Sequence, residues 1–223
     1  MRGTSPLAGS SREPAVPRAT AMARSSSDNP IVTTRPSRGL EEFFSYIRGQ
    51  SGLRILDLGS ANQQNVSFIT NLGHRLYSED FLRILQEVFG AEDTVNQSNL
   101  GRIEYFLNHA LDYGPEQFDG VLVWDVLEYL TPVLLSAVVD KLHAIVRPKS
   151  YLLSFFHSDD NLEVVPRYTF RIQDLSQLQV TQHGMRRPAR LFNNRGLEKL
   201  FVRFDSVKFF LTRDRLREVI AKT

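Results

Sequence analysis

The chain contains no cysteine. This absence excludes disulfide bonds, thiolate metal sites and cysteine nucleophiles together, and it fits a reducing compartment. Long apolar runs are absent as well: the longest apolar-rich stretch, Thr131 to Val146, is interrupted by Asp140, Lys141 and His143 and falls short of the roughly 20 residues of a membrane span. The histidines show no metal-ligand spacing, so we expect no structural metal. We expect a cytoplasmic protein without a membrane span.

The 223 residues, 42% of them hydrophobic, suffice for one well-buried domain and are short for two. Residues 1–38 carry six Arg and two acids, residues 39–164 eight bases and eighteen acids, and residues 165–223 thirteen bases and five acids. Because residues 1–38 are rich in Ser, Pro and Arg without a helical or strand period, they are predicted to be a disordered basic tail. An organelle transit peptide and a translation start at Met22 stay open as alternatives. The domain is expected over residues 39–223.

From residue 39 onward, apolar runs bounded by turn residues alternate with stretches of helical period. Strands are predicted at Leu53–Leu58, Arg75–Ser78, Ile103–Leu107, Gly120–Trp124 and Tyr151–Phe156. Helices are predicted at Gly39–Gln50, Val66–Leu72, Phe81–Phe89 and Pro132–Val146. Strands that alternate with helices form βαβ units, so we expect an α/β fold with a doubly wound, mostly parallel sheet.

The order after His157 is less regular. Further strands are predicted at Tyr168–Ile172, Leu178–Val180 and Ser206–Leu211, and helices at Asn193–Phe201 and from Arg213 onward. This region is expected to complete the sheet and to cover the site.

The first predicted strand ends in an acid and runs into a short turn, Ile55-Leu56-Asp57-Leu58-Gly59-Ser60-Ala61-Asn62-Gln63. An acid that ends an apolar strand needs a buried partner, which a ligand or loop amides supply. In a doubly wound sheet, ligands bind beyond the carboxyl ends of the strands. Asp57 is therefore expected at a binding site, and Glu79 and Asp80 follow the second strand at the same edge.

The fourth predicted strand and the loop behind it read Phe118-Asp119-Gly120-Val121-Leu122-Val123-Trp124-Asp125-Val126-Leu127-Glu128-Tyr129-Leu130. Three segments, taken in order, resemble the motifs of the class I S-adenosylmethionine-dependent methyltransferases of type 11/12. They are Ile55–Gln63, the second strand with Glu79 and Asp80 behind it, and Phe118–Leu130. The resemblance covers Leu53 to about His157 and implies a Rossmann-like sheet of the seven-stranded type. The glycine motif is degenerate, because Ala61 and Gln63 stand where the family commonly has its second and third glycines.

The resemblance also implies a cofactor, S-adenosyl-L-methionine, and the residues around it. Asp57, Gly59, Ser60 and Ala61 would lie beside its amino-acid part. Asp80 would accept hydrogen bonds from its ribose hydroxyls, with Glu79 as a competitor. Asn108 and His109 would lie near the adenine, and Asp125 would complete the cofactor-binding set.

Three residues near the strand ends are candidates for proton transfer in catalysis: Asp125, Glu128 and His157. Each also has a structural interpretation, because the two acids would serve equally as helix caps or solvated groups, and the histidine would satisfy a backbone partner. Tyr129 is expected in the acceptor pocket. Trp124, the last residue of a central strand, is expected in the core rather than against the adenine.

These patterns predict methyl transfer to a small-molecule acceptor. A non-catalytic, methyltransferase-like binding or scaffold protein is the alternative, because fold alone does not decide function. A nicotinamide-dependent oxidoreductase ranks last, since the turn from Gly59 to Gln64 lacks G-x-G-x-x-G. The basic run Met185–Arg190, with Arg195 nearby, is interpreted as a solvated face, and nucleic acid is not the expected partner. The patterns do not address oligomeric state.

Overall fold

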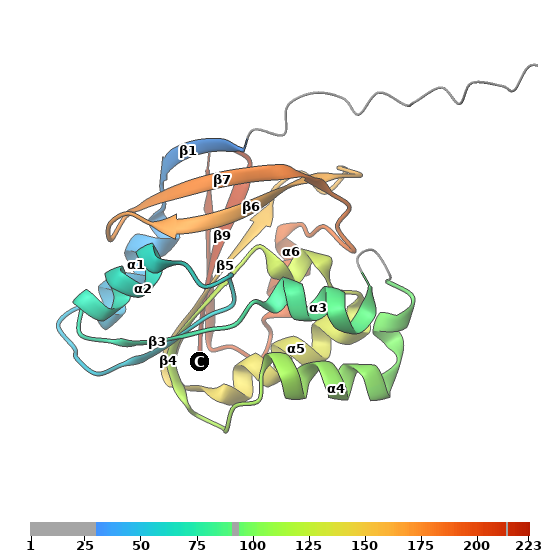
Figure 1. The fold of residues 1–223 in the computed structure, drawn as a ribbon, viewed down its shortest axis with the longest axis horizontal. Helices are drawn as coiled ribbons and strands as arrows, with labels where there is room; N and C mark the ends of the chain where they lie inside the picture. Colours follow the sequence, from blue (N-terminus) through green and yellow to red (C-terminus); the bar gives the residue numbers. More distant parts are fainter. Residues whose placement is uncertain (1–29, 91–93, 213) are drawn as a thin grey trace, which may run out of the picture.

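A six-stranded sheet forms the centre of the computed structural model, which describes residues 30–90, 94–212 and 214–223 (Figure 1). Its strands, in spatial order, are β3 (Arg75–Ser78), β2 (Arg54–Asp57), β4 (Phe118–Trp124), β5 (Val146–His157), β9 (Leu216–Lys222) and β8 (Ser206–Leu211). The first four are parallel, whereas β9 is antiparallel to both of its neighbours. The carboxyl ends of β3, β2, β4 and β5 therefore meet at one edge of the sheet.

Helices lie on both faces of this sheet. One face carries α3 (Phe81–Phe89), α4 (Leu100–Ala110), α5 (Pro132–Ile145) and α6 (Asn194–Leu200), and the other carries α1 (Arg38–Ile47) and α2 (Gln63–Asn71). Two short 3-10 helices, η1 (Asn96–Ser98) and η2 (Val126–Tyr129), lie in the loops. Proline in the first turn of α5, with Thr131 before it, begins the helix where the sequence predicts.

A second sheet of three antiparallel strands packs on the α1 and α2 side. Its order is β1 (Ile31–Pro36), β7 (Gln177–Arg186) and β6 (Val165–Ile172). Figure 1 shows these strands lying across one end of the large sheet. Their inward side chains, among them Phe170 and Ile172, belong to the same apolar cluster as Phe43 and Phe44 of α1. This small sheet brings β6 next to the strand ends.

The apolar core is divided in two by the large sheet, because successive side chains of a strand point to opposite faces. On β4, Val121 and Val123 pack with the α3, α4 and α5 layer. Leu122 and Trp124 pack on the other face with α1 and the small sheet. Both faces of β4 are therefore buried, as expected for a central parallel strand.

The predicted strand at Ile103–Leu107 is wrong, because these residues lie inside α4. Its buried residues, Ile103, Phe106 and Ala110, are three and four positions apart, which is the spacing of one helix face. Within the described residues the large sheet consequently has six strands rather than seven, and β3 is an edge strand.

The predicted helix from Arg213 is also wrong, because Leu216–Lys222 forms β9 between β5 and β8. A strand in that position is buried on both faces, and even Arg217 and Glu218 are almost fully buried. Charged residues in a short C-terminal segment are typical of an exposed helix. Whether this segment forms a helix or a strand is decided by its pairing with β5 and β8, not by its own sequence.

The boundary predicted at residue 38 is wrong as well, since β1 and the start of α1 lie within the predicted tail. Arg35 of β1 donates to the buried Glu218 carboxylate of β9 at 2.6 Å, and its Nε lies 3.1 Å from Asp214. Ser37 and the backbone N–H of Gly39 also donate to Glu218. The domain thus includes β1, and residues 1–29 of the predicted tail lie outside the described residues.

Candidate active site

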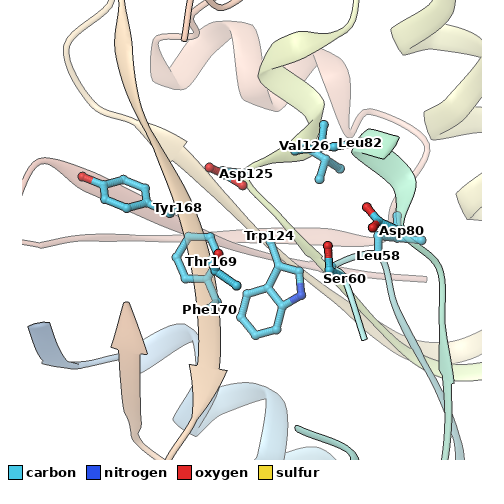
Figure 2. A pocket seen from close by; sticks show the side chains of 11 residues that line it. Leu58, Ser60, Asp80, Leu82, Trp124, Asp125, Val126, Tyr168, Thr169 and Phe170 are labelled. Carbon is cyan, nitrogen blue, oxygen red and sulfur yellow. The ribbon is translucent and has the colours of Figure 1, made fainter. Parts of the chain in front are cut away.

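Three neighbouring strand ends and strand β6 surround a narrow gap (Figure 2). The turn after β2, the residues after β3 and the end of β4 form one side, and β6 forms the other. The gap is lined by Leu58, Gly59, Ser60, Asp80, Leu82, Trp124, Asp125, Val126, Tyr168, Thr169 and Phe170. Its volume is about 60 Å³, whereas pockets that hold small ligands measure roughly 300 to 1,000 Å³. Strand β6 therefore leaves little free space at the strand ends.

The carboxylate of Asp57 is fully engaged by its own chain. It accepts hydrogen bonds from Gly59 N at 2.8 Å, from Trp124 Nε1 at 2.5 Å and from Asn65 Nδ2 at 3.0 Å. Burial raises the pKa of Asp57, and these three donors oppose the rise. The sequence-based expectation of a buried partner is met by a loop amide, a ring N–H and a side-chain amide rather than by a ligand.

Trp124 forms part of the wall between the gap and the core. Its ring stacks on Phe170 of β6, with centroids 5.1 Å apart and planes 6° apart, and on Phe155 of β5. Its backbone has φ of 59°, a left-handed conformation that a bulky residue rarely adopts. Such conformations persist only where the surroundings hold them, and they are common at binding sites. Trp124 is a core residue, as expected, and it is also a direct neighbour of Asp57.

Asn65 links β6 to this network. Its side-chain oxygen accepts from Ile172 N at 2.8 Å, and its side-chain nitrogen lies 3.4 Å from the carbonyl oxygen of Phe170. The same nitrogen donates to Asp57. One buried amide thus holds both the strand that covers the gap and the acid at its base.

The two acids after β3 have different positions. Asp80 lines the gap and caps α3 by accepting from Arg83 N at 3.2 Å. Glu79 instead accepts from the hydroxyl of Tyr113 at 2.5 Å and does not line the gap. Of the two acids predicted as alternatives after β3, only Asp80 lines the gap.

Glu128 and His157 form a buried acid–imidazole pair beside the gap. Glu128 accepts from His157 N at 2.8 Å, and its second oxygen lies 2.6 Å from His157 Nδ1. Because a carboxylate only accepts, the pairing places the imidazole proton on Nδ1 and leaves Nε2 as an acceptor. Burial raises the pKa of Glu128, and the interaction with His157 opposes it. Two residues predicted for proton transfer thus lie in direct contact.

Asp125 directly follows β4 and is 3% exposed. Its Oδ2 atom is buried and has no hydrogen-bond partner among the described residues. Burial, followed by the neighbouring charge of Glu128, raises the pKa of Asp125 to about 7. A carboxyl of this kind exchanges a proton near neutral pH.

Of the remaining predicted site residues, Ser60 lines the gap, whereas Ala61 is exposed and does not line it. Asn108 and His109 lie on the exposed face of α4, where His109 Nδ1 is 2.7 Å from the carbonyl oxygen of Tyr105. Neither is among the residues that line the gap.

Sequence reasoning missed the contributions of Asn65, Tyr168, Thr169 and Phe170 to the site. Asn65 sits on α2 and the other three on β6, more than 100 positions later in the chain. The only signal was the alternation of Tyr168 and Phe170, which predicted the strand but not its place over the gap.

Larger grooves lie elsewhere on the described surface. One, of about 750 Å³, lies between β1 and β8 beside Arg35, whose charge is already compensated by Glu218 and Asp214. A second, of about 360 Å³, lies between α5 and α6, and a third, of about 340 Å³, lies beside α1. None of the three is lined by acids that follow the parallel strands, so the small gap remains the best candidate for chemistry.

The basic run is partly tied to the domain by aromatic contacts. The Arg186 guanidinium lies 4.2 Å from the Tyr129 ring centre, and that of Arg190 lies 5.1 Å from the Phe192 ring centre.

In the described part of the chain, no three His, Asp or Glu side chains are arranged to hold a metal ion. Nor does any described helix have the length and apolarity needed to cross a membrane.

Comparison with known proteins gives structural similarity without sequence similarity. No protein family profile matches the chain, and no curated protein matches it. A methyltransferase from Archaeoglobus fulgidus described as SAM-dependent matches with a TM-score of 0.49 and 14% identity, over 82% of this chain and 91% of that one.

Two further structures are similar to the same extent. The 1,6-didemethyltoxoflavin-N1-methyltransferase of Burkholderia thailandensis, solved with S-adenosylhomocysteine bound, matches with a TM-score of 0.46 and 15% identity, over 83% of this chain and 76% of that one. A SAM-dependent methyltransferase from Methanosarcina mazei matches with a TM-score of 0.43 and 14% identity, over 81% and 96%. At such identities the similarity concerns the backbone fold alone.

Proposed function

We propose that the gap at the ends of β2, β3 and β4 is the S-adenosylmethionine site of a small-molecule methyltransferase. One observation carries this proposal. A glycine turn, an acid after the neighbouring strand and a buried carboxyl with an unpartnered oxygen, at Gly59, Asp80 and Asp125, line a single gap. The strand ends of an open α/β sheet are where nucleotide-like ligands bind.

The chemistry of these residues fits the cofactor. The Asp80 carboxylate accepts hydrogen bonds of the kind that ribose hydroxyls donate. An added Cβ at Gly59 would lie only 3.0 Å from Trp124 Nε1, so the turn has room for backbone alone. The accepting carboxylate of Asp80 and the close backbone approach at Gly59 therefore suit a polar, sugar-containing ligand. The unpartnered Asp125 Oδ2 is left for the methyl acceptor.

The size of the gap requires β6 to move before such a ligand enters. Displacement of β6 would separate Phe170 from Trp124 and break the two contacts of Asn65 with β6. The three present donors of the Asp57 carboxylate lie outside β6, so a ligand ammonium group would reach this carboxylate by replacing one of them, such as Asn65 Nδ2. Loops and strands that close over substrate in this way also exclude water from the reaction.

When bound, S-adenosylmethionine supplies a methyl group on a positively charged sulfur, which is reactive towards an electron pair. The protein's remaining tasks are to align the acceptor and to receive its proton. We assign these tasks to Asp125, Glu128 and His157, which lie on the β4 and β5 side of the gap. Asn108 and His109 are not needed for this arrangement.

A non-catalytic binding domain is the second candidate, and one observation favours it. Asp57 has three internal donors, and the gap is about 60 Å³. A site that stays closed would leave only the fold of a methyltransferase. The two candidates differ in whether β6 releases Trp124.

The test is a titration of the full chain with S-adenosylhomocysteine, followed by calorimetry and by tryptophan fluorescence. Trp124 is the only tryptophan, so its emission reports β6 directly. We expect binding together with a change in emission. Asp80→Asn should weaken binding about tenfold or more, because hydrogen bonds to a charged group contribute roughly 1.5 to 3 kcal/mol.

Asp80→Asn preserves helix capping, because Asn and Asp are equally good N-caps. Glu87→Gln is the matched control. Glu87 pairs with Arg83, as Asp80 does, but it lies outside the gap. This variant should bind like the wild type. Absence of binding in both the wild type and Phe170→Ala, which removes the stack that holds β6, would overturn the proposal in favour of the non-catalytic domain.

A further inference from the structure

Three buried polar atoms beside the gap have no hydrogen-bond partner among the described residues: Asp125 Oδ2, Tyr129 Oη and His157 Nε2. A buried polar group without a partner costs about 1 to 3 kcal/mol, and native proteins contain few of them. Atoms of this kind also occur at His74 and Thr131, but the three beside the gap lie together around η2 and the end of β5. One group from outside the chain would satisfy all three.

The three residues belong to one cluster. Asp125 and Tyr129 flank Glu128 around η2, and Glu128 binds His157 through two contacts. Burial, followed by the charges of Asp125 and Glu128, raises the pKa of Tyr129, so its hydroxyl keeps its proton. The Arg186 guanidinium covers the Tyr129 ring and encloses the cluster from the β7 side.

The hydrogen-bonding capacities of these atoms define the missing group. His157 Nε2 accepts, because Nδ1 carries the proton towards Glu128. The Tyr129 hydroxyl donates, and the Asp125 carboxyl donates when protonated and accepts when ionised. A hydroxyl group satisfies this set with a single oxygen, because it donates once and accepts twice. A carbonyl oxygen would leave His157 unsatisfied, because it has no proton to donate. An ammonium group only donates, so it would leave the hydroxyl proton of Tyr129 without an acceptor.

The surroundings favour a planar group next to that hydroxyl. The Tyr168 ring lies nearly parallel to the His157 ring, with centroids 5.9 Å apart and planes 15° apart. Phe170 and Trp124 continue this aromatic wall along the gap. Flat aromatic surfaces bind flat ligands by stacking.

We propose that Asp125, Tyr129 and His157 form the acceptor subsite and take the hydroxyl group of a phenol-type substrate. The inference rests on the proposed function and deepens it, because it names the acceptor class. The O–H bond of the acceptor breaks and its proton goes to His157 Nε2, while an oxygen electron pair forms the new bond to the methyl carbon. The methyl–sulfur bond of the bound cofactor would break in the same step, and its electron pair would stay on the sulfur of the leaving S-adenosylhomocysteine. Glu128 is a positioning residue that fixes the tautomer of His157, and Tyr129 selects for the hydroxyl.

The test compares phenol with toluene, which has the same shape but no hydroxyl. The ¹⁵N resonance of His157 Nε2, identified by its loss in His157→Gln, is followed as each compound is added to the full chain saturated with S-adenosylhomocysteine. Phenol should shift this resonance and toluene should not. Tyr129→Phe should weaken phenol binding about 3- to 10-fold, the loss expected for one hydrogen bond, and should leave S-adenosylhomocysteine binding unchanged.

Tyr105→Phe is the matched control, since it removes the hydroxyl of an exposed tyrosine on α4. If S-adenosylhomocysteine binds but phenol and toluene bind alike or not at all, the acceptor subsite is refuted and the proposed function stands. If phenol shifts His157 without any S-adenosylhomocysteine binding, the subsite stands and the proposed function fails. A melting-temperature change in Tyr129→Phe with unchanged phenol preference would assign the tyrosine a purely structural role and overturn the inference.

Discussion

The stability of Asp125→Asn relative to that of the wild type should be greater at high pH than at low pH. The folded carboxyl has a pKa raised to about 7 from an ordinary value of 3.8, chiefly by burial and next by the charge of Glu128. Folding therefore favours the protonated form. The wild type loses stability as the pH rises from about 4 to about 7, because the folded state must then ionise a buried acid.

The separation of the two pKa values corresponds to roughly 4 kcal/mol at pH 8, where the folded and unfolded chains are both ionised. At pH 5 the folded carboxyl is still protonated, and the loss of wild-type stability is only about 1 to 2 kcal/mol. The free energy of unfolding of Asp125→Asn, relative to the wild type, should thus increase by about 2 to 3 kcal/mol between pH 5 and pH 8. Asn cannot ionise, so its own contribution is independent of pH.

Urea denaturation followed by circular dichroism at pH 5 and pH 8 measures this difference. Asp140→Asn is the control, since it removes an exposed aspartate of α5 that pairs with Arg203. Its effect should change by less than about 0.5 kcal/mol between the two pH values. A pH-independent effect of Asp125→Asn, or one of opposite sign, would refute the assignment of a raised pKa to this carboxyl.

Two further substitutions test the packing that positions the site, and both are measured by urea denaturation. Gly120→Ala should destabilise the protein by about 1 to 3 kcal/mol, because an added Cβ would lie 2.7 Å from Phe43 Cζ in the filled core. Gly101→Ala is the control: it lies in a helix, its added Cβ has no contact closer than 3.5 Å, and it should be neutral or stabilising. Equal effects of the two substitutions would contradict the packing argument. Glu218→Ala should cost about 3 kcal/mol, because it leaves the buried Arg35 with only the half-exposed Asp214. The double variant Arg35→Met, Glu218→Met should cost less than Glu218→Ala alone, whereas a larger loss would show that the pair stabilises the fold beyond mutual compensation.

The sequence by itself determined the central layers of the fold. Strands with both faces apolar, and helices with one apolar face, are local patterns that burial in a parallel sheet imposes. The proline in the first turn of α5 is a local signal as well. For the same reason the acids at the strand ends, Asp57, Asp80 and Asp125, were predictable as neighbours, since parallel strands end at one edge.

Tertiary structure alone decided the outer strands and the closure of the site. The segment Leu216–Lys222 forms strand β9 because it pairs with β5 and β8. Glu218 within it is buried with its charge compensated by Arg35, a residue far away in the sequence. The position of β6 over the gap depends on Asn65 and on the stack of Phe170 with Trp124, contacts between segments far apart in sequence. Such contacts follow from packing after the chain has folded, and no local period encodes them.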